Sequence, residues 1–369
     1  MKVAFMGGRA YVCVAFDVAW AINLTLCREH LGEVESEFGY RDPQRAPLVL
    51  RQECAPVILG EFATDCAVAA TIYDIGSISI RYRLDLPAGV QLPQLVELSL
   101  LLADNPAIRQ SAAALVAQLL QRLESRAPSA ITPPRLTTAV EDYSIFRLQL
   151  EPGSGIDSLL NDSQREIAQI VKSFPSDPSS QLVHEALSGH HRWSRNADLT
   201  VIDWHAAILI SDGDKAVNLI IDRVLRMLEY ANVQLLNFKG MQLALESQLS
   251  SLEVSLTSGL PAKRGQQKLD ALAIAYTQLF SEVQSSLEAF DNDFLERAFD
   301  TVAARFRFEK KTRDIREKLS RLETITDRLK AAEDHRRMER LEWYIIWLFV
   351  VDIILALVEF ALFFLHKRP

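Results

Sequence analysis

Apolar residues in the first 150 positions fall in patterns typical of short strands. Ala10–Phe16 is rich in β-forming residues. In Ser77–Leu84, the apolar residues Ile78, Ile80, Tyr82 and Leu84 alternate with Ser and Arg, as in a strand with one buried face. Asp74-Ile75-Gly76 predicts a turn before this strand, and Ser144–Leu150 predicts another strand.

Helical patterns lie between these strands. Asp17 is placed to cap a helix that ends near Gly32. Gln94–Leu102 predicts a second helix, and Asn105 with Pro106 predicts the start of a third that runs to about Arg126. Together these patterns predict an α+β N-terminal domain over residues 1–150.

Residues 151–213 predict a loop-rich bridge with short helices and strands. "EPGSGIDSLLNDSQ" and "KSFPSDPSSQ" are rich in Gly, Pro, Ser and Asp, which favour turns. "DLTVIDWHAAILISDGD" predicts two short β runs or one bent strand.

Long helical patterns occupy residues 214–342. One runs from about Lys215 to Thr257, after the N-cap signal Asp212-Gly213-Asp214, and ends at "SGLPAKRG". A second begins near Gln266 and meets no Gly or Pro before Pro369. Such lengths, with apolar residues at three- and four-residue steps after Ile315, predict a helical hairpin that forms a coiled-coil stalk.

The segment 343–365 predicts one C-terminal transmembrane helix. Its 23 residues would span about 35 Å as a helix, against about 30 Å of hydrocarbon. Trp343, Tyr344 and Trp347 cluster at one end, as aromatic residues do at the headgroup level. A buried core helix is the alternative, as is a re-entrant hairpin, although the segment has no Gly or Pro.

Positive charges predict the orientation of this span. The side before the span carries six basic residues within about 20 positions, Arg321, Arg328, Lys330, Arg336, Arg337 and Arg340, and the far side carries two, Lys367 and Arg368. The N-terminus lacks the features of a secretory signal, because Arg9 and Asp17 interrupt its apolar run. We expect a tail-anchored, single-pass protein in the inner (cytoplasmic) membrane, with its N-terminal body in the cytoplasm.

Asp352 and Glu359 are unusual residues for a membrane span. They lie seven positions apart and so share one helix face. An ionised Asp at the bilayer centre costs about 2.5–3.5 kcal/mol, and a single span can find a partner for it only in another chain. We therefore expect self-association through this face and the stalk. The alternatives are a protonated Asp352 that faces lipid, or an oligomeric proton or ion pathway through Asp352.

The charged residues and cysteines indicate which kinds of partner and compartment the protein has. The formal net charge of −8 argues against a nucleic-acid partner. Residues 305–340 nevertheless hold 13 Lys or Arg against 8 Asp or Glu, so this segment is locally basic. Arg336, Arg337 and Arg340 would contact anionic lipid headgroups, or would form a solvated helix face. The four cysteines form no C-x-x-C pair and are expected to be reduced thiols.

Catalytic motifs are weak in this sequence. It contains no Walker loop and no G-x-G-x-x-G, and "HEALSGHH" (184–191) lacks the H-E-x-x-H spacing of a zinc site, so we expect no metal and no cofactor. The strongest candidate is Asp203 with His205, which would share one face of a strand, so that the carboxylate could orient the imidazole. Asp212 and Asp214 could join them in a ligand or cation site. A polar strand end that leads to a helix cap is the structural alternative.

The segment "RLEWYIIWLFVVDIILAL" (340–357) resembles the C-terminal signature of a family of membrane proteins of unknown function. That family includes the "required for meiotic nuclear division" proteins and bacterial relatives, and its pattern places Arg340, Leu341, Glu342 and Trp343 before an Ile-rich span with an acidic residue, here Asp352. "LEYANVQLLNFK" (228–239) is similar to a long-helix motif of related bacterial membrane proteins. The resemblance implies a membrane-anchored α+β domain on a helical stalk, and no established catalytic residues.

These observations favour a protein that is not an enzyme. We expect an oligomeric scaffold or tether that holds a cytoplasmic α+β module at the membrane, with a protein partner that the sequence does not identify. The alternatives are a membrane-bound hydrolase or ligand sensor that uses the Asp203/His205 region, and the ion pathway through Asp352.

Overall fold

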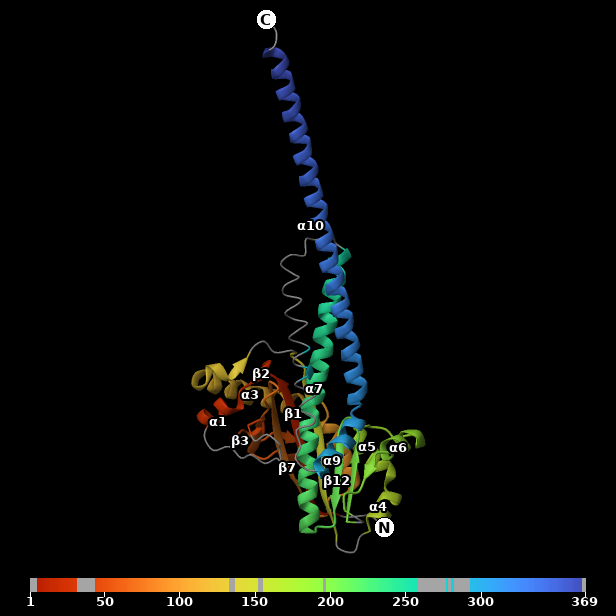
Figure 1. The fold of residues 1–369 in the computed structure, drawn as a ribbon. Coiled ribbons are helices and arrows are strands. Elements are labelled where there is room, and N and C mark those ends of the chain that lie inside the picture. Colours follow the sequence, from red (N-terminus) through yellow and green to blue (C-terminus); the bar gives the residue numbers. More distant parts are fainter. Residues whose placement is uncertain are drawn as a thin grey trace. The chain divides into compact units, whose positions relative to one another are not determined.

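The computed structural model describes residues 5–31, 44–132, 137–151, 155–194, 197–257, 277, 280–281 and 293–366 (Figure 1). The chain folds as two units. Unit 1 comprises Met1–Ala244 and Gln278–Ile315, and unit 2 comprises Leu245–Thr277 and Arg316–Pro369.

An eight-stranded sheet forms the centre of unit 1, in the order β10-β11-β12-β9-β1-β7-β6-β3. Neighbouring strands are antiparallel except β12 and β9, which are parallel. Two short pairs lie outside this sheet: β2 (Ala21–Ile22) with β8 (Ile131–Thr132), and β4 (Ile58–Leu59) with β5 (Phe62–Ala63). The strands of the main sheet are β1 (Phe5–Asp17), β3 (Leu48–Glu53), β6 (Ala67–Ile72), β7 (Ser77–Leu86), β9 (Val140–Leu150), β10 (His190–His191), β11 (Asp198–Ile202) and β12 (Ala206–Ser211).

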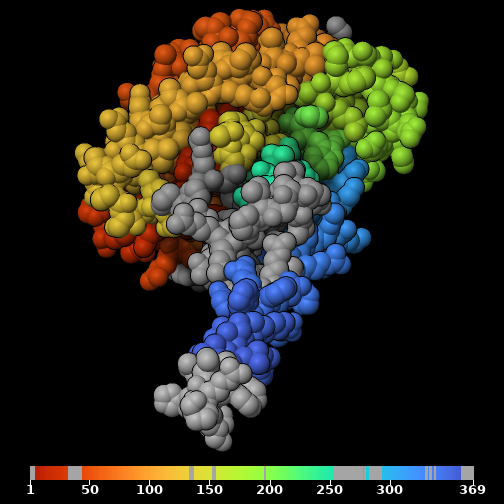
Figure 2. All heavy atoms as spheres, turned by 90° about the horizontal axis from the view of Figure 1, so that it is seen from above, coloured from red at the N-terminus to blue at the C-terminus, as the bar shows by residue number. Residues whose placement is uncertain are grey.

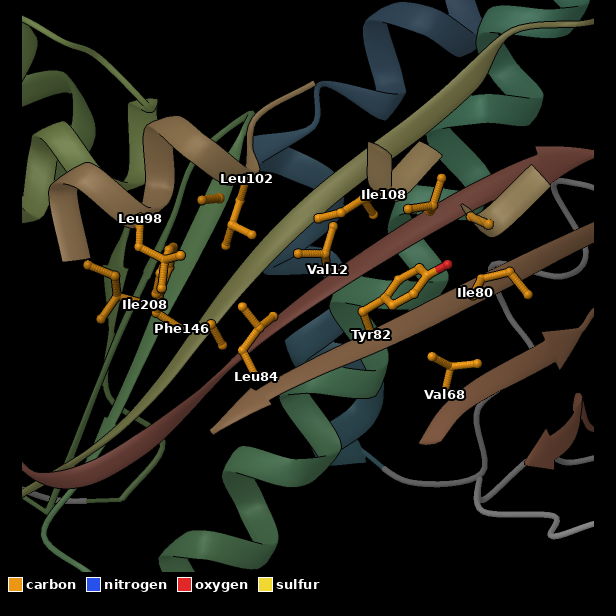
Figure 3. Packing of buried hydrophobic residues seen from close by; sticks show 14 of the residues in the cluster. Val12, Val68, Ile80, Tyr82, Leu84, Leu98, Leu102, Ile108, Phe146 and Ile208 are labelled. Carbon is orange, nitrogen blue, oxygen red and sulfur yellow. The ribbon is translucent and has the colours of Figure 1, made fainter. Parts of the chain in front are cut away.

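One face of the sheet is apolar and packs against helices. Figure 3 shows Leu98, Leu102 and Ile108 of these helices directed toward Val12 and Phe146 of the sheet. Figure 2 shows α2, in orange, beside the yellow-green α5 and α6 on the surface of unit 1. The helices on this face are α2 (Leu92–Leu102), α3 (Pro106–Arg126), α4 (Ile156–Asp162), α5 (Gln164–Lys172) and α6 (Ser180–Leu187), and the shorter α1 (Leu24–Leu31) contacts α3.

The other face is covered by α7 (Lys215–Thr257), which follows β12 directly. α9 (Asp293–Arg305) joins it through aromatic contacts, such as Phe299 with Tyr230 of α7. Because successive strand residues alternate between the faces, each buried strand contributes to two different layers. Unit 1 is therefore a three-layer α+β domain.

Several elements form where local sequence signals predicted them. Gly76 has φ +77° in the turn between β6 and β7, where a Cβ would lie 2.0 Å from the carbonyl oxygen of Ala19. The Asn105 side chain accepts hydrogen bonds from the amides of Ala107 and Ile108 at the start of α3. Asp214 caps α7 in the same way. These predictions are confirmed.

Two local predictions differ from the structure. Asp17 ends β1 instead of capping a helix, and its carboxylate accepts a hydrogen bond from the Thr137 amide. The cap of α1 is Asn23, whose side chain accepts from the Leu26 amide. The helix cap lies six residues later than predicted, at Asn23 and not at Asp17, because residues 18–22 first form hydrogen bonds with the Gly76 turn and with β8.

The second difference is a break in the helix predicted from Gln266 onward. Among the described residues, α9 ends at Arg305 and α10 (Phe308–His366) begins three residues later. Arg307 adopts φ +52°, which lets the chain turn without Gly or Pro. Phe306 packs edge-on against Tyr143, and Phe308 packs against Phe238, so aromatic burial compensates for the interruption. Gln266 itself lies outside the described residues.

The sheet also continues across the boundary predicted at residue 150. β9 lies in the predicted N-terminal domain, and its parallel neighbour β12 lies in the predicted bridge. In addition, the described part of the bridge contains the helices α4, α5 and α6 and the β11–β12 hairpin.

Unit 2 contains the end of α7 and most of α10. Leu245 and Leu249 of α7 are buried, as are Leu319 and Leu322 of α10, and Lys318 forms an ion pair with Glu246. These are packed helices, and a long coiled-coil stalk stays a prediction. Within α10, Met338–Val358 is long and apolar enough to cross a membrane.

Candidate functional site

The sheet face that α7 covers carries polar side chains. Along β7, Ser77, Ser79 and Arg81 point to this face, while Ile78 and Ile80 point to the apolar core. Both serines are fully buried. A buried polar group is unfavourable unless it is hydrogen-bonded, so the covering helix must supply partners.

Polar residues of α7 supply partners for Ser77, Thr71 and Arg81, whereas the buried Ser79 hydroxyl has no hydrogen-bond partner among the described residues. The Glu229 carboxylate lies 2.5 Å from Arg81 Nη1 and accepts a hydrogen bond of 3.2 Å from the Thr71 hydroxyl. Two turns further along, Asn237 Oδ1 accepts a hydrogen bond of 2.9 Å from Ser77. We call these five residues the polar layer.

Further contacts of α7 reach backbone carbonyl groups of β1 and β9 and one side chain of β9. Asn232 Nδ2 donates to the carbonyl oxygens of Cys13 and Glu141, and Lys239 pairs with the Glu141 carboxylate at 2.6 Å. Burial and the neighbouring Glu229 charge raise the pKa of the Cys13 thiol well above its usual value. Cys13 therefore stays a neutral thiol and is not a reactive nucleophile.

A cavity of about 540 Å³ opens beside the first turns of α7. It lies where β9 and β12 end and β1 begins. The residues that line it are Gly7, Gly8, Arg9, Asp85, Leu86, Arg147, Leu148, Gln149, Ser211 and Asn218. We call it the strand-end pocket.

Two arginines dominate the charge of this pocket. Arg9 and Arg147 are directly opposite each other in the antiparallel register of β1 and β9. Arg9 Nε lies 3.2 Å from Asp85 Oδ1, and Arg147 Nη1 lies 3.1 Å from Asp222 Oδ1. Burial raises the pKa of Asp222, and the neighbouring arginines act in the opposite direction. The pocket therefore combines two cations with partly exposed carboxylates.

Asp203 lies in the turn between β11 and β12, and its side chain is only 1% exposed. Its Oδ2 lies 3.0 Å from both Lys172 Nζ and Arg305 Nη2, and its Oδ1 accepts from the Trp204 amide. The Tyr143 hydroxyl donates to its carbonyl oxygen. Asp203 thus holds together α5, α9 and two strands of the sheet.

Among the described residues, the hydrogen bonds and ion pairs of this carboxylate are made with Lys172, Arg305 and the Trp204 amide, and not with the other residues of the predicted Asp203 site. His205 is exposed in the same turn, while Asp212 and Asp214 are exposed beyond the far end of β12. The six residues of β12 put roughly 20 Å between these ends. Asp212 and Asp214 instead shape the start of α7, where Asp212 Oδ1 accepts from the Asp214 amide.

His184 and His190 line a second cavity, of about 500 Å³, between α4, α5 and α6. His191 stacks on Trp193, with ring centroids 5.7 Å apart. Among the residues that the structure describes, no three His, Cys, Asp or Glu side chains are grouped so that they could hold a metal ion.

The predicted membrane residues lie on α10. Trp343, Trp347, Asp352 and Arg340 are exposed along the apolar segment and its start. The side chains of Arg336, Arg337 and Glu359 lie outside the described residues.

Sequence reasoning did not select Arg9, Arg147 or the polar layer. The available signal is a charged residue inside an otherwise apolar strand, as in "GGRAYVCVAF" and "SIFRLQL". For α7, the corresponding signal is the group of amide and acidic residues in "LEYANVQLLNFK". Neither signal tells which residues meet in space.

The model of one protein family, described as "Uncharacterized protein MJ0711, N-terminal domain", matches residues 7–216, more than half of the chain. The match contains the eight strands of the main sheet except the first two residues of β1, and it ends as α7 begins. No curated protein and no solved structure matches the chain.

Proposed function

Because the chain belongs to the family of the uncharacterized protein MJ0711, N-terminal domain, which brings no known activity, we propose a function from the geometry of α10. We propose that the chain is a single-span membrane protein that holds unit 1 at the membrane surface and acts there as an oligomeric scaffold or tether. The scaffold role follows the resemblance of residues 340–357 to the membrane family with the meiotic-division proteins.

One observation carries the proposal. Every large apolar side chain from Met338 to Val358 is 40–72% exposed, on all sides of one helix. An apolar surface of this extent is not tolerated in water by a soluble monomer. The 21 residues would span about 31 Å, which matches a hydrocarbon core of about 30 Å.

The basic residues before the span support a cytoplasmic position for unit 1, since Lys and Arg are retained on that side of the inner membrane. Arg340, which is exposed at the start of the span, would reach the headgroup region together with Arg336 and Arg337. Each basic residue near an anionic surface contributes about 1 kcal/mol of attraction.

Membrane fractionation tests the anchor. The full-length chain is expected to remain in the membrane pellet after high-speed centrifugation and carbonate extraction. Replacing Leu348 and Leu355 by Arg adds roughly 5–7 kcal/mol to the cost of insertion and should release the protein into the supernatant. The same change at Leu219 and Leu243, two exposed leucines of α7, is the matched control and should leave it in the pellet. Wild-type protein in the detergent-free supernatant would contradict the anchor.

A second measurement tests self-association. Asp352 has no partner among the described side chains of the span, so contact with a second copy would give its carboxyl group a hydrogen-bonding site. Asp352→Leu is expected to reduce the oligomer size in detergent, as measured by light scattering on a sizing column. Glu342→Leu, at the start of the span, is the control for the loss of a carboxylate. An unchanged size for Asp352→Leu would refute this part of the proposal while leaving the anchor in place.

A further inference from the structure

The strand-end pocket occupies a special position in the sheet. β9 and β12 are parallel neighbours, so their carboxyl ends meet at one edge. After β9 the chain passes to α4, α5 and α6 on the apolar face, whereas after β12 it passes to α7 on the opposite face. Adjacent parallel strands whose connections leave toward opposite faces open a crevice between them, which is where ligands bind in open sheets.

Glycines keep the backbone accessible in this crevice. Met6 lies outside the pairing register at a β-bulge, between Phe5 and Gly7, and such bulges leave backbone groups free of the ladder. A Cβ on Gly8 would lie 2.5 Å from the Arg147 carbonyl oxygen, so no larger residue fits. Between β12 and α7, Gly213 has φ +95°, and a Cβ there would lie 2.4 Å from Nε2 of the pocket residue Gln149.

The charges of the pocket favour an anion. Arg9 and Arg147 face each other across two paired strands, and like charges in that position repel. Their partners Asp85 and Asp222 are 59% and 49% exposed, so these ion pairs are weak and exchangeable. Asp214 already occupies the first amides of α7, so the attraction comes from the guanidinium groups.

We propose that the strand-end pocket binds a small molecule that carries a phosphate or carboxylate group, with Arg147 and Arg9 as its anion-binding residues. This inference goes beyond the proposed membrane anchor and does not depend on it. Guanidinium groups present paired N–H donors that match both kinds of oxyanion.

The dimensions and lining of the pocket define the rest of the ligand. A cavity of about 540 Å³ is larger than a single anion needs and lies in the range of small-molecule sites. Ser211 and Asn218, which are hydrogen-bonded to each other, and Gln149 line it beside the arginines. The body of the ligand is therefore polar, and an apolar molecule would leave these groups without partners.

Binding can be measured on the full-length chain purified in detergent. Inorganic phosphate, pyrophosphate and citrate are titrated by calorimetry, with sodium chloride at the same ionic strength as the reference. We expect heat of binding and a raised Tm with at least one of the three anions. A phosphate or pyrophosphate response identifies a phosphate-bearing ligand, and a citrate response alone identifies a carboxylate.

Arg147→Gln should weaken the binding at least about tenfold, a difference of about 1.4 kcal/mol. Arg192→Gln is the matched control, because Arg192 is similarly buried and pairs with the exposed Asp157 outside the pocket. If Arg147→Gln does not fold, the more exposed Arg9→Gln takes its place. The proposal is overturned if none of the anions binds more than chloride does, or if the folded arginine variant binds like the wild type.

Discussion

The contact between Arg81 and Glu229 gives the sharpest test of how α7 is held. Their side chains are 11% and 3% exposed, so each charge depends on the other. Arg81→Met leaves the Glu229 carboxylate buried without its cation, which typically costs about 3–5 kcal/mol. For a domain of this size we expect Tm to fall by roughly 6–20 °C.

The double variant Arg81→Met, Glu229→Met distinguishes the cost of a single unpaired buried charge from the net contribution of the ion pair. Replacing both partners by apolar residues is often nearly neutral, because neither charge then needs to be desolvated. The remaining loss is the hydrogen bond that Thr71 donates to Glu229, about 1 kcal/mol. If the single changes acted independently, the double variant would instead lose about 6–10 kcal/mol.

Urea unfolding, followed by circular dichroism and tryptophan fluorescence, measures the loss in free energy of unfolding for the single variants and for the double variant. Arg83→Met is the control on the same strand and face, because the Arg83–Asp65 pair is more exposed and should contribute only about 0–1 kcal/mol. The reasoning fails if Arg81→Met lowers the free energy of unfolding by less than about 1 kcal/mol. It also fails if the double variant is as unstable as the sum of the single ones.

Three further predictions concern other contacts of unit 1. Burial lowers the pKa of His191 below 6.5, so the unfolded chain binds a proton at this histidine before the folded chain does. The stability of the folded chain should therefore fall as the pH drops below that value. His191→Phe should flatten the dependence of Tm on pH between 7.5 and 5.5, and the control variant His205→Gln, at an exposed position, should not. Asp203→Asn removes the carboxylate that two cations share and should lower the free energy of unfolding by roughly 3 kcal/mol, measured by urea titration; an unchanged midpoint would contradict this. Gly76→Ala should destabilise unit 1 by roughly 1–3 kcal/mol, because alanine would have to adopt a positive φ and its Cβ would collide with the Ala19 carbonyl. An unchanged Tm would contradict this expectation.

Elements with complete local signals could be predicted from the sequence. Asn105 followed by Pro106 specifies the start of α3, because the cap and the fixed φ of proline act within one turn. Gly76 specifies its turn for a similar reason. The start of α10 could not be predicted, since Arg307 carries no turn signal and takes its conformation from the aromatic contacts of its neighbours.

The candidate site depended on pairings that no local pattern contains. Arg9 and Arg147 come together because β1 lies beside β9, and Gln149 meets Ser211 because β9 lies parallel to β12. The charge pattern of α7 was equally ambiguous, because Glu229 and Asn237 would look the same on a solvated helix face. These two residues become part of a buried layer because Thr71 and Ser77, on the sheet face that α7 covers, form hydrogen bonds with them.

That layer also determines the position of α7 on the sheet. Glu229 and Asn237 are eight residues apart and bind different parts of the β6–β7 hairpin. A slip of the helix by one turn, about 5.4 Å, would break both contacts at once and leave Arg81 buried without a partner. Asp222 and Asn218, about two and three turns before Glu229, are thereby held at the strand-end pocket. An anion that draws Arg147 away from Asp222 therefore changes the contacts of the first turns of α7, while the polar layer keeps the register of the helix on the sheet.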